Sequence, residues 1–260
     1  MLKNKINAIR LSALAVAVTG AMGATQAVAE VDVSASVSVS NLYLFRGIDL
    51  GNGRAMVSGD LIASMNGFYG GVWATSGDQA AGSEYDLFVG YGMEFDQISL
   101  DVSIINYNYP GMDSADQFGD FSEIFLNVGY GPFSFDYQAN VADGSYGSAD
   151  SEKAKAAGVS GFQYYAFNAT FKQLTVTLGI ADYNDYDEDN PIGGASDIAV
   201  GDVGTDYSHL DVSYAYNDNL TFTVSKITDQ KQLEVSGDTT KYENRDEDPL
   251  VVVSYTLPIE

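Results

Sequence analysis

Carboxylate side chains recur at alternate positions along extended, apolar segments of this sequence. In 85–109, Asp86 and Glu94 fall between apolar residues such as Leu87 and Val89. Because successive side chains of a strand point to opposite faces, a period of two places the acids on one face and the apolar residues on the other. The same parity selects one set of charged residues: Arg46, Arg54, Asp60, Asp86, Glu94, Asp101, Glu123, Asp136 and Asp211. A surface lined by this mainly acidic set attracts cations and repels anions.

The elements that position these charges are strands of membrane-spanning length. Segment 85–109 reads as two strands joined at Asp96-Gln97, and each has about ten residues, which crosses a bilayer when tilted. The same alternation predicts about twelve strands along the chain. They cover approximately 31–47, 54–65, 68–76, 85–95, 98–109, 123–130, 133–140, 162–171, 174–180, 210–216, 220–224 and 250–257.

The connections between these strands alternate strictly in length. Those after the even-numbered strands are short turns: 66–67, 96–97, 131–132, 172–173 and 217–219. Those after the odd-numbered strands are longer: 47–53, 77–83, 110–120, 143–161, 182–205 and 228–248. Bacterial outer-membrane barrels have this asymmetry, with short periplasmic turns, long external loops and an even strand number. The sequence therefore predicts an all-β fold, a transmembrane antiparallel up-and-down β-barrel.

Aromatic residues support this orientation. Six of them lie on the apolar face beside the short turns: Phe95, Tyr130, Phe133, Phe171, Tyr216 and Phe222. Amphipathic rings prefer the membrane interface, so we expect them to form a periplasmic girdle.

The first residues form a secretory signal. A basic start with Lys3, Lys5 and Arg10 precedes an apolar run, and Ala27-Val28-Ala29 is an A-x-A cleavage site. We therefore expect a signal peptide at 1–29 and a barrel domain at 30–260, exported to the bacterial outer membrane. After cleavage no apolar run is long enough for a membrane helix, and the chain has no cysteine.

The charge excludes one class of partner. The whole chain has a formal net charge of −24, and removing three basic residues with the signal leaves 9 − 36 = −27. Phosphate binding needs a basic surface, so nucleic acid is excluded as a partner. Outer-membrane lipid, lipopolysaccharide and small solutes or cations remain as expected partners.

Four landmarks resemble a known family. Asn41-Leu-Tyr-Leu-Phe-Arg-Gly-Ile48 resembles the Y-x-F-R-G-I signature of the TorF-type porin family, a group of conserved hypothetical outer-membrane proteins from proteobacteria. Segments 67–73, 85–91 and 107–111 resemble the family's next three landmarks, in order. The resemblance implies an outer-membrane pore and assigns no substrate.

Three further features of the sequence could do chemistry. Loop 182–190 is densely acidic and could bind Ca²⁺ through its oxygens, but it lacks the glycine and spacing of an EF-hand, so a solvated external loop is the simpler interpretation. Arg46 could create a transverse field at a constriction or lock onto Asp49 or Asp60. Ser208 and His209, the single histidine, point to opposite faces of a strand and cannot form a catalytic pair.

The sequence thus predicts a porin-like channel for passive diffusion of small cationic or neutral solutes, lined by the charged set above. It needs no cofactor or metal, and we expect it not to be an enzyme. The alternative is a non-conducting barrel, blocked by inward Phe88 and Tyr107, whose acidic external loops act as a binding or surface-structural module.

Overall fold

The structure is a computed structural model of the chain. It describes residues 31–79, 82–110, 121–143, 161–183, 205–231, 233–234, 241–242, 245 and 247–259. The predicted signal peptide at 1–29 and most of the acidic loop 182–190 lie outside the described residues, so the Ca²⁺ hypothesis for that loop stays a prediction.

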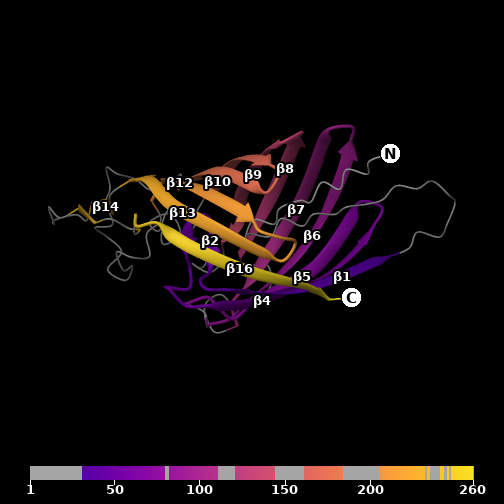
Figure 1. The fold of residues 1–260 in the computed structure, drawn as a ribbon, viewed down its shortest axis with the longest axis horizontal. Coiled ribbons are helices and arrows are strands. Elements are labelled where there is room, and N and C mark those ends of the chain that lie inside the picture. Colours follow the sequence, from indigo (N-terminus) through magenta and orange to yellow (C-terminus); the bar gives the residue numbers. More distant parts are fainter. Residues whose placement is uncertain are drawn as a thin grey trace.

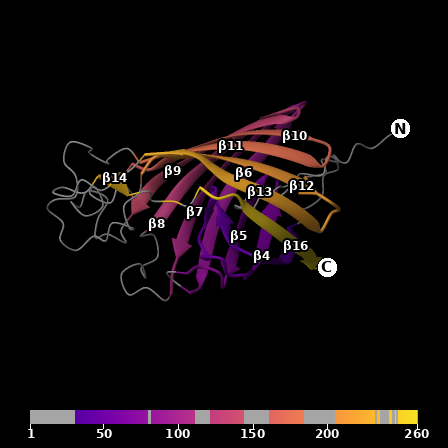
Figure 2. The same ribbon diagram turned by 60° about the vertical axis from the view of Figure 1, so that its left-hand side comes forward.

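Twelve antiparallel strands close into one barrel, which confirms the predicted fold (Figures 1 and 2). Strand β1 closes the barrel against β16, with Val37 opposite Leu257. Two further two-stranded pairings lie outside the barrel wall, β2 (Leu44–Phe45) with β3 (Ile48–Asp49) and β14 (Leu233–Glu234) with β15 (Lys241–Tyr242). The barrel strands are β1 (Asp32–Ser40), β4 (Met56–Met65), β5 (Phe68–Thr75), β6 (Glu84–Phe95), β7 (Ile98–Asn108), β8 (Phe121–Tyr130), β9 (Phe133–Asp143), β10 (Gln163–Phe171), β11 (Leu174–Asp182), β12 (Tyr207–Ala215), β13 (Leu220–Gln230) and β16 (Leu250–Ile259).

The period of two in the sequence becomes an apolar outside and a polar inside. Along β11 exposed and buried residues alternate, with Leu178 and Ile180 on the outside and Thr175 and Thr177 inside. Val89 on β6 is 55% exposed, whereas its neighbour Phe88 is buried. This apolar outer band is the surface that a barrel presents to lipid.

Tight turns connect the strands at one end of the barrel. Asn66, Asp96 and Lys172 adopt positive φ angles of 53°, 56° and 58°, which suits hairpins of the twist-compatible type. The six predicted girdle aromatics are all exposed at this end, on the outer face: Phe95, Tyr130, Phe133, Phe171, Tyr216 and Phe222. No helix in the described part of the chain is long and apolar enough to cross a membrane.

The first strand is shorter than predicted. It ends at Ser40 rather than at residue 47. The chain bends at 41–42, and Arg46 and Gly47 then adopt left-handed φ angles of 50° and 80° that a strand cannot continue. The Leu50 amide instead donates to the Tyr43 carbonyl at 2.8 Å. Residues 41–55, called here the inserted segment, fold back into the barrel. The prediction for Arg54 was also wrong. It placed Arg54 at the start of the second strand, whereas Arg54 lies in the inserted segment and β4 begins at Met56.

A charge on the lipid-facing wall tests the membrane orientation. We expect Val89→Arg, near the middle of β6, to lower the free energy of unfolding by about 2–4 kcal/mol, because a charge at the bilayer midplane is poorly solvated. The control Val33→Arg places the charge on the outer face of β1 near the short turns. It should lower the free energy of unfolding by about 0–1 kcal/mol. Urea titration in lipid vesicles measures both. Equal costs would contradict this orientation.

Candidate functional site

The barrel interior is divided by side-chain size. In the half nearer the long connections, called here the outer half, large side chains face inward from several strands. They include Trp73, Phe88, Tyr107, Tyr164 and Tyr207. In the half nearer the short turns, called the inner half, the inward positions carry mostly small polar or acidic side chains. Examples are Ser99, Asp101, Asn127, Ser134 and Asp136.

Arg46 holds the inserted segment inside the outer half. Its guanidinium contacts both carboxylate oxygens of Glu123 on β8, at 2.5 and 3.1 Å, and donates to Gln138 Oε1 on β9 at 2.8 Å. The side chains of Arg46 and Glu123 are only 7% and 1% exposed. Tyr107 donates to the same carboxylate at 2.9 Å. This bidentate, charge-assisted geometry is the strong form of the interaction.

The partner of Arg46 is therefore neither of the two that the sequence suggested. Asp49 instead accepts the backbone amides of Gly51 and Gly53, which shapes the turn of the inserted segment. Asp60 accepts the Ser36 hydroxyl on the neighbouring strand. The prediction failed because it placed Arg46 at the end of a strand, whereas the chain leaves the wall after Ser40 and carries Arg46 across to β8.

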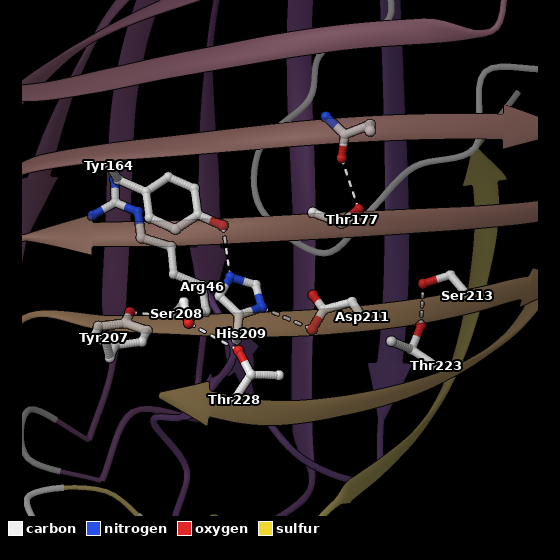
Figure 3. A network of polar contacts seen from close by, with 11 residues as sticks. Arg46, Tyr164, Thr177, Tyr207, Ser208, His209, Asp211, Ser213, Thr223 and Thr228 are labelled. Atoms are coloured by element: carbon white, nitrogen blue, oxygen red, sulfur yellow. Dashed lines mark hydrogen bonds and ion pairs between the residues drawn. The ribbon is translucent and has the colours of Figure 1, made fainter. Parts of the chain in front are cut away.

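A second polar network lies directly beside the inserted segment (Figure 3). Tyr164 Oη lies 2.7 Å from His209 Nε2, and His209 Nδ1 lies 2.9 Å from Asp211 Oδ1. The Tyr207 hydroxyl donates to the Arg46 carbonyl at 2.9 Å. A Cβ on Gly47 would lie 2.4 Å from His209 Cγ, so the inserted segment rests directly on the histidine ring.

The His209 network has the order carboxylate, imidazole, hydroxyl, in which the carboxylate orients the imidazole. The hydroxyl is a phenol, and His209 is 1% exposed beneath the inserted segment. Ser208 points the other way, to Thr228 at 2.8 Å (Figure 3), which confirms that it does not pair with His209. The sequence could not identify this network, because Tyr164 on β10 and His209 on β12 are 45 positions apart.

The remaining predicted charges lie apart. Asp101 accepts the Tyr69 hydroxyl at 2.8 Å, and Asp136 is bonded by Asn127 and Asn168 in the inner half. Glu94 and Arg54 are exposed. Asp86 is buried and inward.

Sequence reasoning missed Glu84, which faces inward at the start of β6 and is 4% exposed. Its parity with Asp86 was a usable signal, but the predicted strand began one residue later. Among the described residues, no three His, Asp or Glu side chains are grouped to hold a metal ion.

Two glycine substitutions test the contact between Gly47 and His209. Gly47→Ala should destabilise the barrel by about 2–4 kcal/mol, because the added methyl meets the imidazole and the residue has a positive φ. Gly53→Ala also has a positive φ, with no atom within 4 Å of the added methyl, and should cost about 1–2 kcal/mol. Fluorescence of Trp73, whose ring lies 6.0 Å from that of Tyr43, reports on the inserted segment during urea unfolding.

Removing the Arg46 guanidinium should have a larger effect. We expect Arg46→Ala to cost about 3–5 kcal/mol, because it leaves the buried Glu123 carboxylate without its cation. The control Arg54→Ala removes an exposed arginine of the same segment and should change stability by about 0.5 kcal/mol or less. A small effect of Arg46→Ala in the same unfolding assay would show that Glu123 is neutralised in another way.

Comparison with known proteins gives solved structures of similar fold. An active-site mutant of outer membrane phospholipase A from Escherichia coli is 11% identical with a TM-score of 0.42, covering 86% of this chain and 88% of that chain. The unmutated E. coli protein is 9% identical with a TM-score of 0.40, covering 86% and 88%. The Salmonella typhi enzyme, a dimer with bound calcium, is 10% identical with a TM-score of 0.41, covering 86% and 89%. No curated protein matches the chain.

These structures correct one expectation. The prediction that the chain is not an enzyme is contradicted, because the solved structures it resembles are those of an enzyme. The physical reason is that a barrel fold does not fix function, and catalytic groups can meet across strands where sequence spacing does not reveal them. At 9–11% identity the likeness concerns the fold alone.

A family model matches residues 24–240, most of the chain, and its members are described as bacterial proteins of unknown function. The match agrees with the predicted resemblance to a family of conserved hypothetical bacterial proteins. It does not confirm that this family is the TorF porin type. The chain belongs to this family, Gcw_chp.

Proposed function

We propose that the protein is an outer-membrane channel for small cations and neutral solutes, with the inserted segment as its constriction. The observation that carries the proposal is the excess of inward carboxylates over inward cations in a closed barrel. Asp60, Asp101, Asp136 and Asp211 all face the interior, with Asp101 and Asp136 in the inner half. Acidic linings of this kind favour cations over anions. The resemblance to TorF-type porins at 41–48 supports the same function.

Charges in different parts of the proposed path would have different effects on a passing cation. Asp101 and Asp136 in the inner half would raise the local cation concentration. Arg46 would otherwise oppose cations at the constriction, but its charge is balanced by Glu123 at 2.5 Å. Of the predicted pore-lining set, Glu94 and Arg54 are exposed and would act at the two mouths of the barrel. Asp86 and Glu123 would act in the outer half.

A non-conducting barrel is the second candidate, and one observation favours it. Phe88, Tyr107 and the inserted segment fill much of the outer half, and both aromatic side chains are buried, at 6% and 7% exposure. In this case the acidic external loops 143–161, 182–205 and 228–248, which lie largely outside the described residues, would act as a binding or surface-structural module.

Planar-bilayer recording under a KCl gradient separates the two candidates. The channel proposal expects discrete current steps with a reversal potential that favours K⁺. The double variant Asp101→Asn/Asp136→Asn should shift this potential toward zero, because it removes two inner-half charges. The control Asp229→Asn removes an exposed charge near the outer end of β13 and should leave the potential unchanged. Silence from folded wild-type barrels, checked by heat-modifiable migration, would contradict the channel and favour the second candidate.

A further inference from the structure

Two buried carboxylates lie side by side at the outer end of β6. Glu84 and Asp86 face the interior two residues apart and are 4% and 3% exposed. Glu84 accepts the Tyr43 hydroxyl at 2.9 Å and the Tyr109 hydroxyl at 3.2 Å, so both of its oxygens are engaged. Asp86 Oδ1 is also buried and has no hydrogen-bond partner.

No cation in the described part of the chain neutralises this pair. Arg46 uses its guanidinium on Glu123 and Gln138, and Lys231 contacts Asp206 at 2.7 Å. Neither Glu84 nor Asp86 forms an ion pair with a described residue. An ionised carboxylate removed from water is strongly destabilised unless it is paired, and two neighbours also repel each other. The pair therefore requires either a proton or a bound cation.

The donor atoms at this place select the class of cation. They are carboxylate and phenol oxygens only, with no nitrogen or sulfur donor, which suits hard cations. Two carboxylates match the charge of a divalent ion, and Ca²⁺ tolerates irregular oxygen sets completed by water. Asp86 Oδ1 supplies an open ligand position, and the two tyrosines fix the orientation of Glu84.

The pair lies close to the outer end of the barrel. Glu84 is the first residue of β6 and directly follows Ser83, which is exposed. A cation from the outer side therefore has no need to cross the inner half of the barrel.

We propose that Glu84 and Asp86 bind a hard divalent cation of the Ca²⁺ class at the outer end of the barrel. Because Tyr43 belongs to the inserted segment and donates to Glu84, the bound cation also fastens this segment to the β6 wall. The site goes beyond the channel function and does not require conduction, since a non-conducting barrel would bind the cation equally well.

The test measures Ca²⁺ binding to the refolded full-length protein in detergent micelles. Tb³⁺ serves as the probe, because the rings of Tyr43 and Tyr109 at the site sensitise its luminescence, and Ca²⁺ is then added to displace it. We expect Asp86→Asn to weaken the Ca²⁺-displaceable signal at least tenfold. The matched control Asp229→Asn removes an exposed carboxylate near the outer end of β13 and should bind as the wild type does. Equal affinity of the wild type and Asp86→Asn would overturn the proposal.

A second measurement begins with the wild type alone, so it does not depend on whether the variants fold. Ca²⁺ should raise the urea midpoint of wild-type unfolding, because it binds the folded state. This increase should be reduced in Tyr43→Phe and lost in Asp86→Asn. Absence of any Ca²⁺ effect on the wild type would overturn the proposal and indicate that the pair is neutralised by a proton. Both readouts are independent of bilayer current, so a failure here and a failure of the channel proposal are distinguishable.

Discussion

The structure depends on one constraint, that every backbone amide and carbonyl in a lipid environment must find a partner within the protein. Strands satisfy it only when the sheet has no free edge, so the chain must close β1 onto β16. Side chains reinforce the outer end of this seam. Asn41 donates to the Val251 carbonyl and accepts the Val253 amide, at 2.9 and 2.6 Å. Closure also determines the environment of each side chain, because successive residues of a strand face lipid and the interior in turn.

The interior must consequently hold polar side chains away from bulk water, and the two halves do so differently. In the inner half, short side chains bond to neighbours on adjacent strands, as Asp136 does with Asn127 and Asn168. In the outer half, buried wall carboxylates are bonded by side chains from outside the wall. The inserted segment supplies Tyr43 and Arg46 to satisfy the wall residues Glu84 and Glu123. The same contacts that complete the polar network thus narrow the barrel.

The sequence could predict what depends on local pattern. Alternation fixed the inward faces of β6 and β7, and turn residues such as Asp96 marked the short connections. It could not predict the inserted segment, because Arg46 and Glu123 are 77 positions apart and nothing local distinguishes an arginine in a strand from one in a left-handed turn. Partners across the interior, including the contact of Gly47 with His209, depend on barrel closure and on loop conformation, which a single sequence does not determine.

The use of charge to hold the inserted segment has an energetic consequence. A buried ion pair recovers little more than its own desolvation cost, so Arg46–Glu123 specifies where the segment lies more than it stabilises the barrel. The inserted segment also has apolar contacts, because Leu42 and Leu44 are buried against Val252 of β16. Burial of these side chains stabilises the segment without selecting one arrangement, since apolar contacts are not directional. The ion pair, which needs a defined geometry, therefore determines where the segment lies, and the apolar contacts supply more of the free energy that keeps it there.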